Sequence, residues 1–149
     1  MISRLVPVLL AAGAIFAAAP AAAQFAKSED AVNYRQSAMF LQAQHFGRVA
    51  AMANGRVPFD AAAAAANAEL VATISKLPWA GFAAGTEGGK AKPEIWKEQA
   101  KFKELSDKLQ ANTEKLAVVA KGGNLDAIKA QVAATGETCK SCHDAYRNR

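Results

Sequence analysis

Apolar residues recur every three or four positions in four stretches of the chain, and clusters of Gly, Pro and Asn separate these stretches. That spacing predicts amphipathic helices, whereas the alternation typical of strands is almost absent. The first helix is expected to have Ser28 as its N-cap and to end at Asn54-Gly55. Glu29 and Asp30 then lie at the positive end of its dipole.

The other three helices have similar boundary signals. The second is expected to open after Asp60 and to end before Pro78, because proline cannot continue a helix. The third is expected to begin at Pro93, which suits a first turn, and to run to Gly122-Gly123. Asn124 can cap the fourth.

Each of these helices has an apolar stripe that is expected to face the centre of the molecule. In the first helix the stripe comprises Val32, Gln36, Met39, Ala43, Phe46 and Ala50. In the second it comprises Leu70, Val71, Ile74 and Leu77. In the third it comprises Ile95, Phe102, Leu105, Leu109, Leu116 and Val119. In the fourth it comprises Ile128, Val132, Thr135, Cys139, Cys142 and Tyr146, so both thiols are expected to face the core.

A glycine-rich segment between Trp79 and Lys92 separates the first two helices from the last two, and it is long enough to cross one end of a bundle. Two short links and one longer one therefore join the four helices. Such a chain most simply forms an all-α, antiparallel up-down-up-down four-helix bundle, an architecture that can hold cofactors. Gly136 costs about 1 kcal/mol relative to Ala within the fourth helix, so a kink is expected there if anywhere.

The N-terminal residues have the features of a secretory signal peptide. Arg4 precedes an apolar run, and small residues at Ala21 and Ala23 suit cleavage after Ala23. The run is shorter than the roughly 20 residues needed to cross a bilayer. We therefore expect a cleaved segment at 1–23, one domain at 24–149, a periplasmic location and no stable membrane insertion after cleavage.

Composition narrows the classes of partner. The chain has 18 Lys and Arg against 13 Asp and Glu, a formal net charge of +5. The cations are scattered among the anions, which argues against binding of nucleic acid and favours a solvated surface with a mild bias towards acidic partners.

The chemistry is concentrated in one pentapeptide, Cys139-Lys140-Ser141-Cys142-His143. A Cys-X-X-Cys-His run is the attachment signature of c-type haem. Two thiols three residues apart share a helical face and can reach the two vinyl groups of a porphyrin, while the adjacent imidazole reaches the iron. The motif predicts one covalent haem c per chain, with Cys139 and Cys142 as thioethers and His143 as the axial iron ligand.

Three other interpretations of the motif stay open. A structural zinc site would need His45 as its fourth ligand, from a distant part of the chain. A redox-active dithiol usually lies at a strand-to-helix turn of a βαβ unit, and no strand pattern is nearby. Two unrelated thiols are the third interpretation.

Combined with the helix pattern and with Tyr34-Arg35-Gln36, the motif makes the sequence resemble cytochrome c′ of the class II cytochromes c. The resemblance covers the whole of residues 24–149. Further segments that carry it are Gln24-Phe25-Ala26-Lys27, His45-Phe46-Gly47-Arg48, Leu77-Pro78-Trp79-Ala80, Gly85-Thr86-Glu87-Gly88-Gly89, Pro93-Glu94-Ile95-Trp96 and His143-Asp144-Ala145-Tyr146-Arg147.

The resemblance implies a homodimeric periplasmic haem protein whose iron has His143 as its single protein ligand. The opposite, distal side of the iron then lies in an apolar pocket. Members of the family bind NO and CO, are implicated in handling NO, and can also pass electrons to a redox partner, which the sequence leaves unidentified.

Four residues are expected at the haem edge or near its proximal side. Arg35 and Gln36 are expected at the propionates, because the matching Arg-Gln pair contacts haem in cytochromes c′. Lys90, in the long loop, is a further candidate for a propionate. Arg147 lies one turn beyond His143, so its guanidinium can pack near the proximal imidazole.

Met39 decides between two functions. If its thioether only packs in the distal pocket, with Phe46 and Trp79 as walls, the iron keeps an open position for NO or CO. If it coordinates the iron opposite His143, the protein is a low-spin electron-transfer cytochrome with histidine and methionine ligands. The resemblance favours the open position. No acid-base pair suited to catalysis is visible near the distal face, so no enzyme activity is expected.

Overall fold

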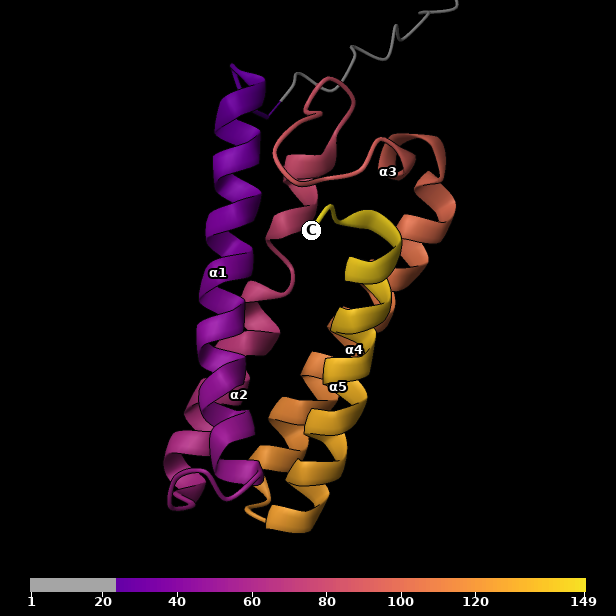
Figure 1. Ribbon diagram of the computed structural model, residues 1–149. Coiled ribbons are helices and arrows are strands. Elements are labelled where there is room, and N and C mark those ends of the chain that lie inside the picture. The colour runs from indigo at the N-terminus through magenta and orange to yellow at the C-terminus, as the bar shows by residue number, and fades with distance from the viewer. Residues whose placement is uncertain (1–23) are drawn as a thin grey trace, which may run out of the picture.

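The computed structural model describes residues 24–149, and the expected signal segment lies outside them. Four long helices make up most of this range: α1 (Ser28–Ala53), α2 (Ala61–Ile74), α4 (Gln99–Lys121) and α5 (Leu125–Tyr146). The 3₁₀ helix η1 (Pro78–Phe82) and the single-turn α3 (Glu94–Lys97) lie in the connection between α2 and α4. The long helices form an antiparallel up-down-up-down bundle (Figure 1), which confirms the expected fold class.

The expected Asn124 cap is confirmed, and Asp60, after which the second helix was expected to open, is also an N-cap. The Asp60 carboxylate accepts a hydrogen bond from the backbone N–H of Ala63 at 3.0 Å, and the Asn124 side chain accepts one from Ala127 at 2.9 Å. Ser28 is wrong as an N-cap, because it is already the first residue of α1 and the extended residue before it is Lys27.

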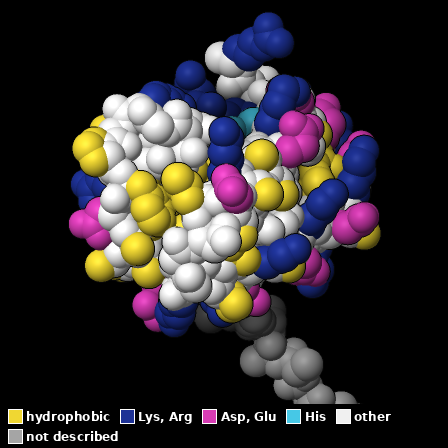
Figure 2. Space-filling view, turned by 90° about the horizontal axis from the view of Figure 1, so that it is seen from below, with side chains coloured by type: hydrophobic (Ala, Val, Ile, Leu, Met, Phe, Trp, Pro, Cys, Tyr) yellow, Lys and Arg dark blue, Asp and Glu magenta, His cyan; other side chains and the backbone are white. Residues whose placement is uncertain are grey.

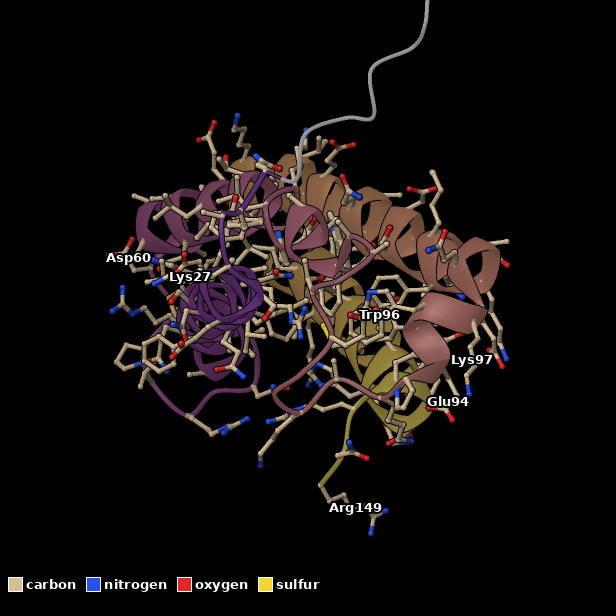
Figure 3. The ribbon with its side chains drawn as sticks, turned by 90° about the horizontal axis from the view of Figure 1, so that it is seen from above. Lys27, Asp60, Glu94, Trp96, Lys97 and Arg149 are labelled. Atoms are coloured by element: carbon tan, nitrogen blue, oxygen red, sulfur yellow. The ribbon has the colours of Figure 1, made fainter. Side chains whose placement is uncertain are left out.

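Two expected helices are shorter than the apolar pattern suggested. The second ends at Ile74 and not at Leu77, and Pro78 then opens η1. The third is broken at Glu98, whose φ of −112° and ψ of 42° separate α3 from α4. The break allows α3 to direct Trp96 towards the middle of the bundle (Figure 3).

Helix α5 runs through Gly136 without interruption. The ring tip of Phe46, from α1, lies 3.9 Å from the position that a Cβ on Gly136 would take. Gly136 therefore lies against α1 without interrupting α5.

The half of the bundle farther from the C-terminus is filled with protein side chains. Its buried cluster comprises Val49, Ala53, Ala68, Leu116, Ala117, Ala120, Ile128 and Val132. Burial of each large aliphatic side chain contributes roughly 1.5–3 kcal/mol. Seen from that end, Lys, Arg, Asp and Glu side chains intermingle around the rim (Figure 2). This half has the features of a structural core.

The face of α1 that is buried differs from the expected stripe. Its buried residues include Ala31, Arg35, Ala38, Gln42 and Val49. Of the expected residues, Gln36 and Ala43 are exposed, whereas Val32, Met39, Phe46 and Ala50 are partly buried. The reason is that α1 makes far fewer contacts with α5 than with α2, so its expected stripe borders open space.

Within the described residues, no helix combines the length and the apolarity needed to cross a membrane.

Candidate haem site

A cavity of about 510 Å³ opens at the end of the bundle that carries the C-terminus of α5. Such a volume is typical of cofactor pockets, which span roughly 300–1,000 Å³. The residues of α1 that line it are Arg35, Gln36, Met39, Phe40 and Ala43. Those of the connection between α2 and α4 are Trp79, Phe82, Lys90, Ala91 and Ile95. Those of α4 and the end of α5 are Phe102, Cys142, His143, Tyr146 and Arg147.

Aromatic rings form much of the cavity wall. The ring centre of Phe102 lies 4.9 Å from that of Phe82, 5.7 Å from Trp79 and 5.5 Å from Tyr146, all edge-on. Such pairs contribute about 0.5–1.5 kcal/mol each beyond their burial. These contacts make the wall apolar and hold its rings in place.

Protein partners satisfy the polar groups of two wall residues. The Trp79 indole N–H donates to the carbonyl of Ser75 at 2.6 Å, and the Tyr146 hydroxyl donates to Glu98 at 2.8 Å. Burial and the bond to Glu98 raise the pKa of Tyr146 to about 12, so its hydroxyl keeps its proton.

The haem motif lies on the last two turns of α5. Cys142 and His143 line the cavity, and Cys139 lies one turn earlier, outside its lining. Both cysteines are free and partly buried. Burial raises the pKa of Cys139, and burial with the nearby Cys139 raises that of Cys142 to about 11, so both thiols are neutral.

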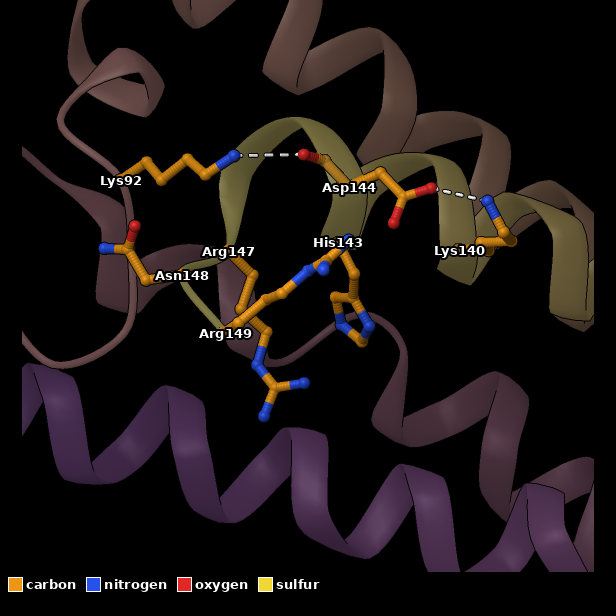
Figure 4. A pocket seen from close by; sticks show the side chains of 7 residues that line it. All are labelled: Lys92, Lys140, His143, Asp144, Arg147, Asn148 and Arg149. Carbon is orange, nitrogen blue, oxygen red and sulfur yellow. Dashed lines mark hydrogen bonds and ion pairs between the residues drawn. The ribbon is translucent and has the colours of Figure 1, made fainter.

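The surroundings of His143 favour its neutral form. Burial, followed by the charge of Arg147, lowers the pKa of its imidazole. A neutral imidazole has a free nitrogen lone pair, which iron ligation needs. Figure 4 shows the ring directed from α5 towards α1, with Arg147 and Arg149 beside it.

A second cavity, of about 680 Å³, adjoins His143 at the end of α5. Lys92 donates there to the carbonyls of Asp144 at 3.0 Å and Ala145 at 3.2 Å, which are unpaired carbonyls of the last helical turn. Lys140 also pairs with the Asp144 carboxylate at 2.5 Å. These bonds fix the helix end that carries His143 (Figure 4).

Arg35 is buried to 3% exposure on α1. Its guanidinium donates to the carbonyl of Gly81, to that of Thr86 at 2.7 Å and to that of Gly88 at 2.8 Å. It also lies 4.6 Å from the ring centre of Phe82. Burial lowers its pKa, yet a guanidinium stays charged. Arg35 therefore ties α1 to the connection that forms one wall of the cavity.

The hydrogen bonds of Arg35 depend on a close approach between the backbones of α1 and η1. A Cβ on Gly81 would lie only 2.8 Å from the carbonyl oxygen of Ala31, so a larger residue would push η1 away from α1. Gly88, at φ +136°, adopts a conformation that other residues rarely adopt.

Most of the residues expected around the haem come together here. The cavity lining includes Arg35, Gln36, Met39, Trp79, Lys90, Cys142, His143 and Arg147. Phe46 was expected to wall the distal pocket, but it lies outside the cavity lining and packs against the apolar core and Gly136. The reason is that Phe46 lies about one turn beyond Ala43 on α1, past the end of the cavity.

Sequence reasoning missed Phe82 as a wall residue. It lies in the irregular connection, where no periodic pattern marks a side chain as inward. Phe102 and Tyr146 were expected in the core, and the structure places them at the cavity.

The geometry fits a covalent haem. The aromatic walls suit a porphyrin, neutral Cys142 and His143 lie on one side, and the cations Lys90 and Arg147 line the same cavity, where propionates need positive partners. The zinc interpretation finds no support: His45 bonds instead to Asn67 at 2.9 Å, and residues 24–149 contain no cluster of three or more His, Cys, Asp or Glu suited to a metal.

Comparison with known proteins gives a consistent result. A protein-family model described as cytochrome c′ matches residues 30–147. The cytochrome c′ of Alcaligenes xylosoxydans xylosoxydans is 52% identical over 126 residues, which cover 85% of this chain and 99% of that protein. The cytochrome c′ of Rubrivivax gelatinosus is 50% identical over 129 residues, covering 85% of this chain and all of the relative.

Solved structures agree with the sequences. A nitric oxide complex of a leucine-to-alanine variant of cytochrome c prime from Alcaligenes xylosoxidans superposes with a TM-score of 0.82 at 51% identity, covering 85% of this chain and 99% of that chain. Cytochrome c′ from Rubrivivax gelatinosus gives 0.81 at 51% identity, with 84% and 100% covered.

The role of Arg35 can be tested by Arg35→Lys. A lysine keeps the charge but cannot hold three carbonyls with a planar fork, so we expect the free energy of unfolding to fall by about 2–3 kcal/mol. Urea unfolding of the haem-free chain measures this, with exposed Arg48→Lys as the control. Equal unfolding midpoints for the two variants would show that the hydrogen bonds from Arg35 to the three carbonyls do not contribute to stability.

Proposed function

The chain belongs to the cytochrome c′ family and binds covalent haem c with iron, and from this premise we propose that it takes up NO and CO and handles NO in the periplasm. The observation that carries the proposal is the apolar cavity between Met39 and His143. Nitric oxide complexes of two variants of the Alcaligenes relative, at about half identity, support it.

Three residues of α5 are proposed to hold the haem. Cys139 and Cys142 are one turn apart, which suits two thioethers to a single porphyrin, and His143 is proposed as the axial ligand of the iron. The iron, when bound, supplies the open position at which a gas binds. Gln36, Lys90 and Arg147 are proposed to face the haem edge, with Arg35 placing the adjacent connection.

The cavity walls are proposed to select the ligand. Lys90 and Arg147 are proposed to be paired with the propionates, and the rings of Trp79, Phe82 and Phe102 offer an anion no hydrogen bonds, so an anion must lose its hydration to lie against them. An uncharged diatomic gas is weakly hydrated, so it loses little hydration free energy on entering the cavity. Lining residues include no carboxylate and no second histidine, so we propose no enzymatic turnover.

An electron-transfer cytochrome is the second candidate function. Met39 lines the same cavity as His143, and its thioether would raise the reduction potential of the iron if it coordinated. We favour a Met39 that packs in the cavity without binding the iron, because nitric oxide complexes of variants of the Alcaligenes relative support gas binding. Electron exchange with a periplasmic partner is the role that coordination would favour.

Export is proposed through a signal peptide at 1–23. The relative from Alcaligenes matches over 99% of its length with 126 residues, which is the length of 24–149. That agreement supports a mature chain that begins at Gln24.

Gas binding can be tested on the reduced, haem-loaded protein. We expect CO to change the absorption spectrum with one gas molecule per haem, whereas azide at the same concentration leaves the oxidised spectrum unchanged, because the aromatic wall around Met39 offers an anion no hydrogen bond. Absence of any CO response would contradict the proposal.

A homodimer is proposed through α1 and α2. The hydrogen bond between His45 and Asn67 places these helices side by side, and Leu41 and Leu70, 48% and 44% exposed, lie one turn away from it on each helix. Exposed leucines at the same level of adjacent helices suit a second copy of the chain.

Leu41→Glu tests this interface. A buried, unpaired carboxylate opposes association, so we expect the sedimentation coefficient to fall to that of a monomer over a concentration range in which the unaltered protein stays dimeric. The control is Val118→Glu on α4, where the valine is 72% exposed. A monomeric unaltered protein, or a dimer that tolerates Leu41→Glu, would contradict the proposed surface.

A further inference from the structure

Cations gather at the end of α5 that carries His143, and four of them surround that helix end in Figure 4. Apart from the buried Arg35, the cations that line the two cavities are Lys90, Lys92, Lys140, Arg147 and Arg149. We call these five residues the cationic cluster, and all but the half-buried Lys92 are exposed. Among the described residues that line the two cavities, Asp144 is the one carboxylate.

The cationic cluster contains the whole charge surplus of the described chain. Without Arg4, 17 Lys and Arg stand against 13 Asp and Glu in residues 24–149, a side-chain surplus of four. Five cations against Asp144 give the cluster a surplus of four as well, so the remaining 12 cations and 12 anions of residues 24–149 balance. The cations are scattered along the sequence, but the fold concentrates the positive field where the cavities open.

Backbone hydrogen bonds hold these like charges together. The N–H of Lys92 donates to the carbonyl of Tyr146 at 2.9 Å, and the N–H of Asn148 donates to that of Lys90 at 2.9 Å. Like charges held side by side repel one another. Within residues 24–149, neither arginine of the cluster forms an ion pair with a carboxylate. The arrangement therefore suits a negatively charged partner that relieves the repulsion.

The cationic cluster surrounds the residue that is proposed to bind the iron. His143 is exposed and lines both cavities. Binding of CO requires ferrous iron, so the proposed gas uptake needs a donor that delivers an electron to ferric iron. Two haem propionates would lower the surplus of the cluster from four to about two, so this surface stays positive.

We propose that the cationic cluster is the docking surface for an acidic redox protein that reduces the haem. This inference rests on the proposed function. One electron passes from the reduced partner to ferric iron, which gives ferrous iron and an oxidised partner, and no bond or proton changes. Opposite charges speed the encounter and orient the partner towards His143. A protein suits the surface better than an anionic membrane, because a lipid headgroup cannot supply the electron.

Arg149→Glu and Lys140→Gln test the proposal in the haem-loaded protein. The control is Lys115→Glu, which changes the net charge as much as Arg149→Glu but alters an exposed lysine of α4 next to the packed core. The probe is a plant-type ferredoxin, an acidic one-electron carrier with a reduction potential of about −400 mV. The readouts are the Kd of oxidised ferredoxin from calorimetry and the second-order rate constant for haem reduction by reduced ferredoxin.

For the unaltered protein we expect the rate constant to fall about tenfold, and the Kd to rise, between roughly 20 mM and 500 mM salt, because salt screens opposite charges. At low salt, Arg149→Glu should lower the rate constant about fivefold and Lys140→Gln about twofold, and Lys115→Glu should stay close to the unaltered protein. Equal losses in Arg149→Glu and Lys115→Glu, or a rate constant independent of salt, would overturn the docking surface.

Vesicles of phosphatidylglycerol test the membrane as the alternative partner. Co-sedimentation with these vesicles that is lost in Arg149→Glu, together with ferredoxin readouts that this variant leaves unchanged, would overturn the proposal in favour of a membrane. Failure of the dithionite-reduced, unaltered protein to bind CO would instead contradict the proposed function. The two failures are therefore distinguishable.

Discussion

The open half of the bundle depends on one buried cation. Arg35 joins α1 to the connection between α2 and α4 by donating to Gly81, Thr86 and Gly88, and its guanidinium also lies against Phe82. Because that connection contributes Trp79, Phe82 and Lys90 to the cavity, the same contacts that satisfy Arg35 position one wall of the site. A charged group buried this deeply is stable only because backbone carbonyls compensate its lost hydration.

One half of the bundle contains the packed core, and the other half contains the cavity. Aliphatic packing closes the half around Val49, Leu116 and Ile128, whereas the other half keeps α1 and α5 apart around an aromatic-walled cavity. The end of α5 is fixed by Lys92, which binds the carbonyls of its last turn. His143 is thus presented from a rigid helix end, as a preorganised ligand site requires.

The sequence predicted the bundle and the haem motif because both depend on local patterns, namely helical periodicity and a pentapeptide. It misplaced the buried stripe of α1, since a helix face that borders a cofactor cavity is as apolar as one that packs on protein. The partners of Arg35 lie 46 to 53 residues away, and no local pattern encodes them. The burial of Gln42 was not predicted, because a glutamine in a helix is ordinarily an exposed residue.

The balance between gas binding and electron transfer depends on Met39, which lies on the cavity wall across from the end of α5. The absorption spectrum of the oxidised, haem-loaded protein, compared with that of Met39→Ala, tests it most directly. With an open iron position, both proteins should give a high-spin spectrum without a methionine-sulfur band. A low-spin spectrum with such a band, lost in Met39→Ala, would show that Met39 is an iron ligand and contradict the gas-binding account.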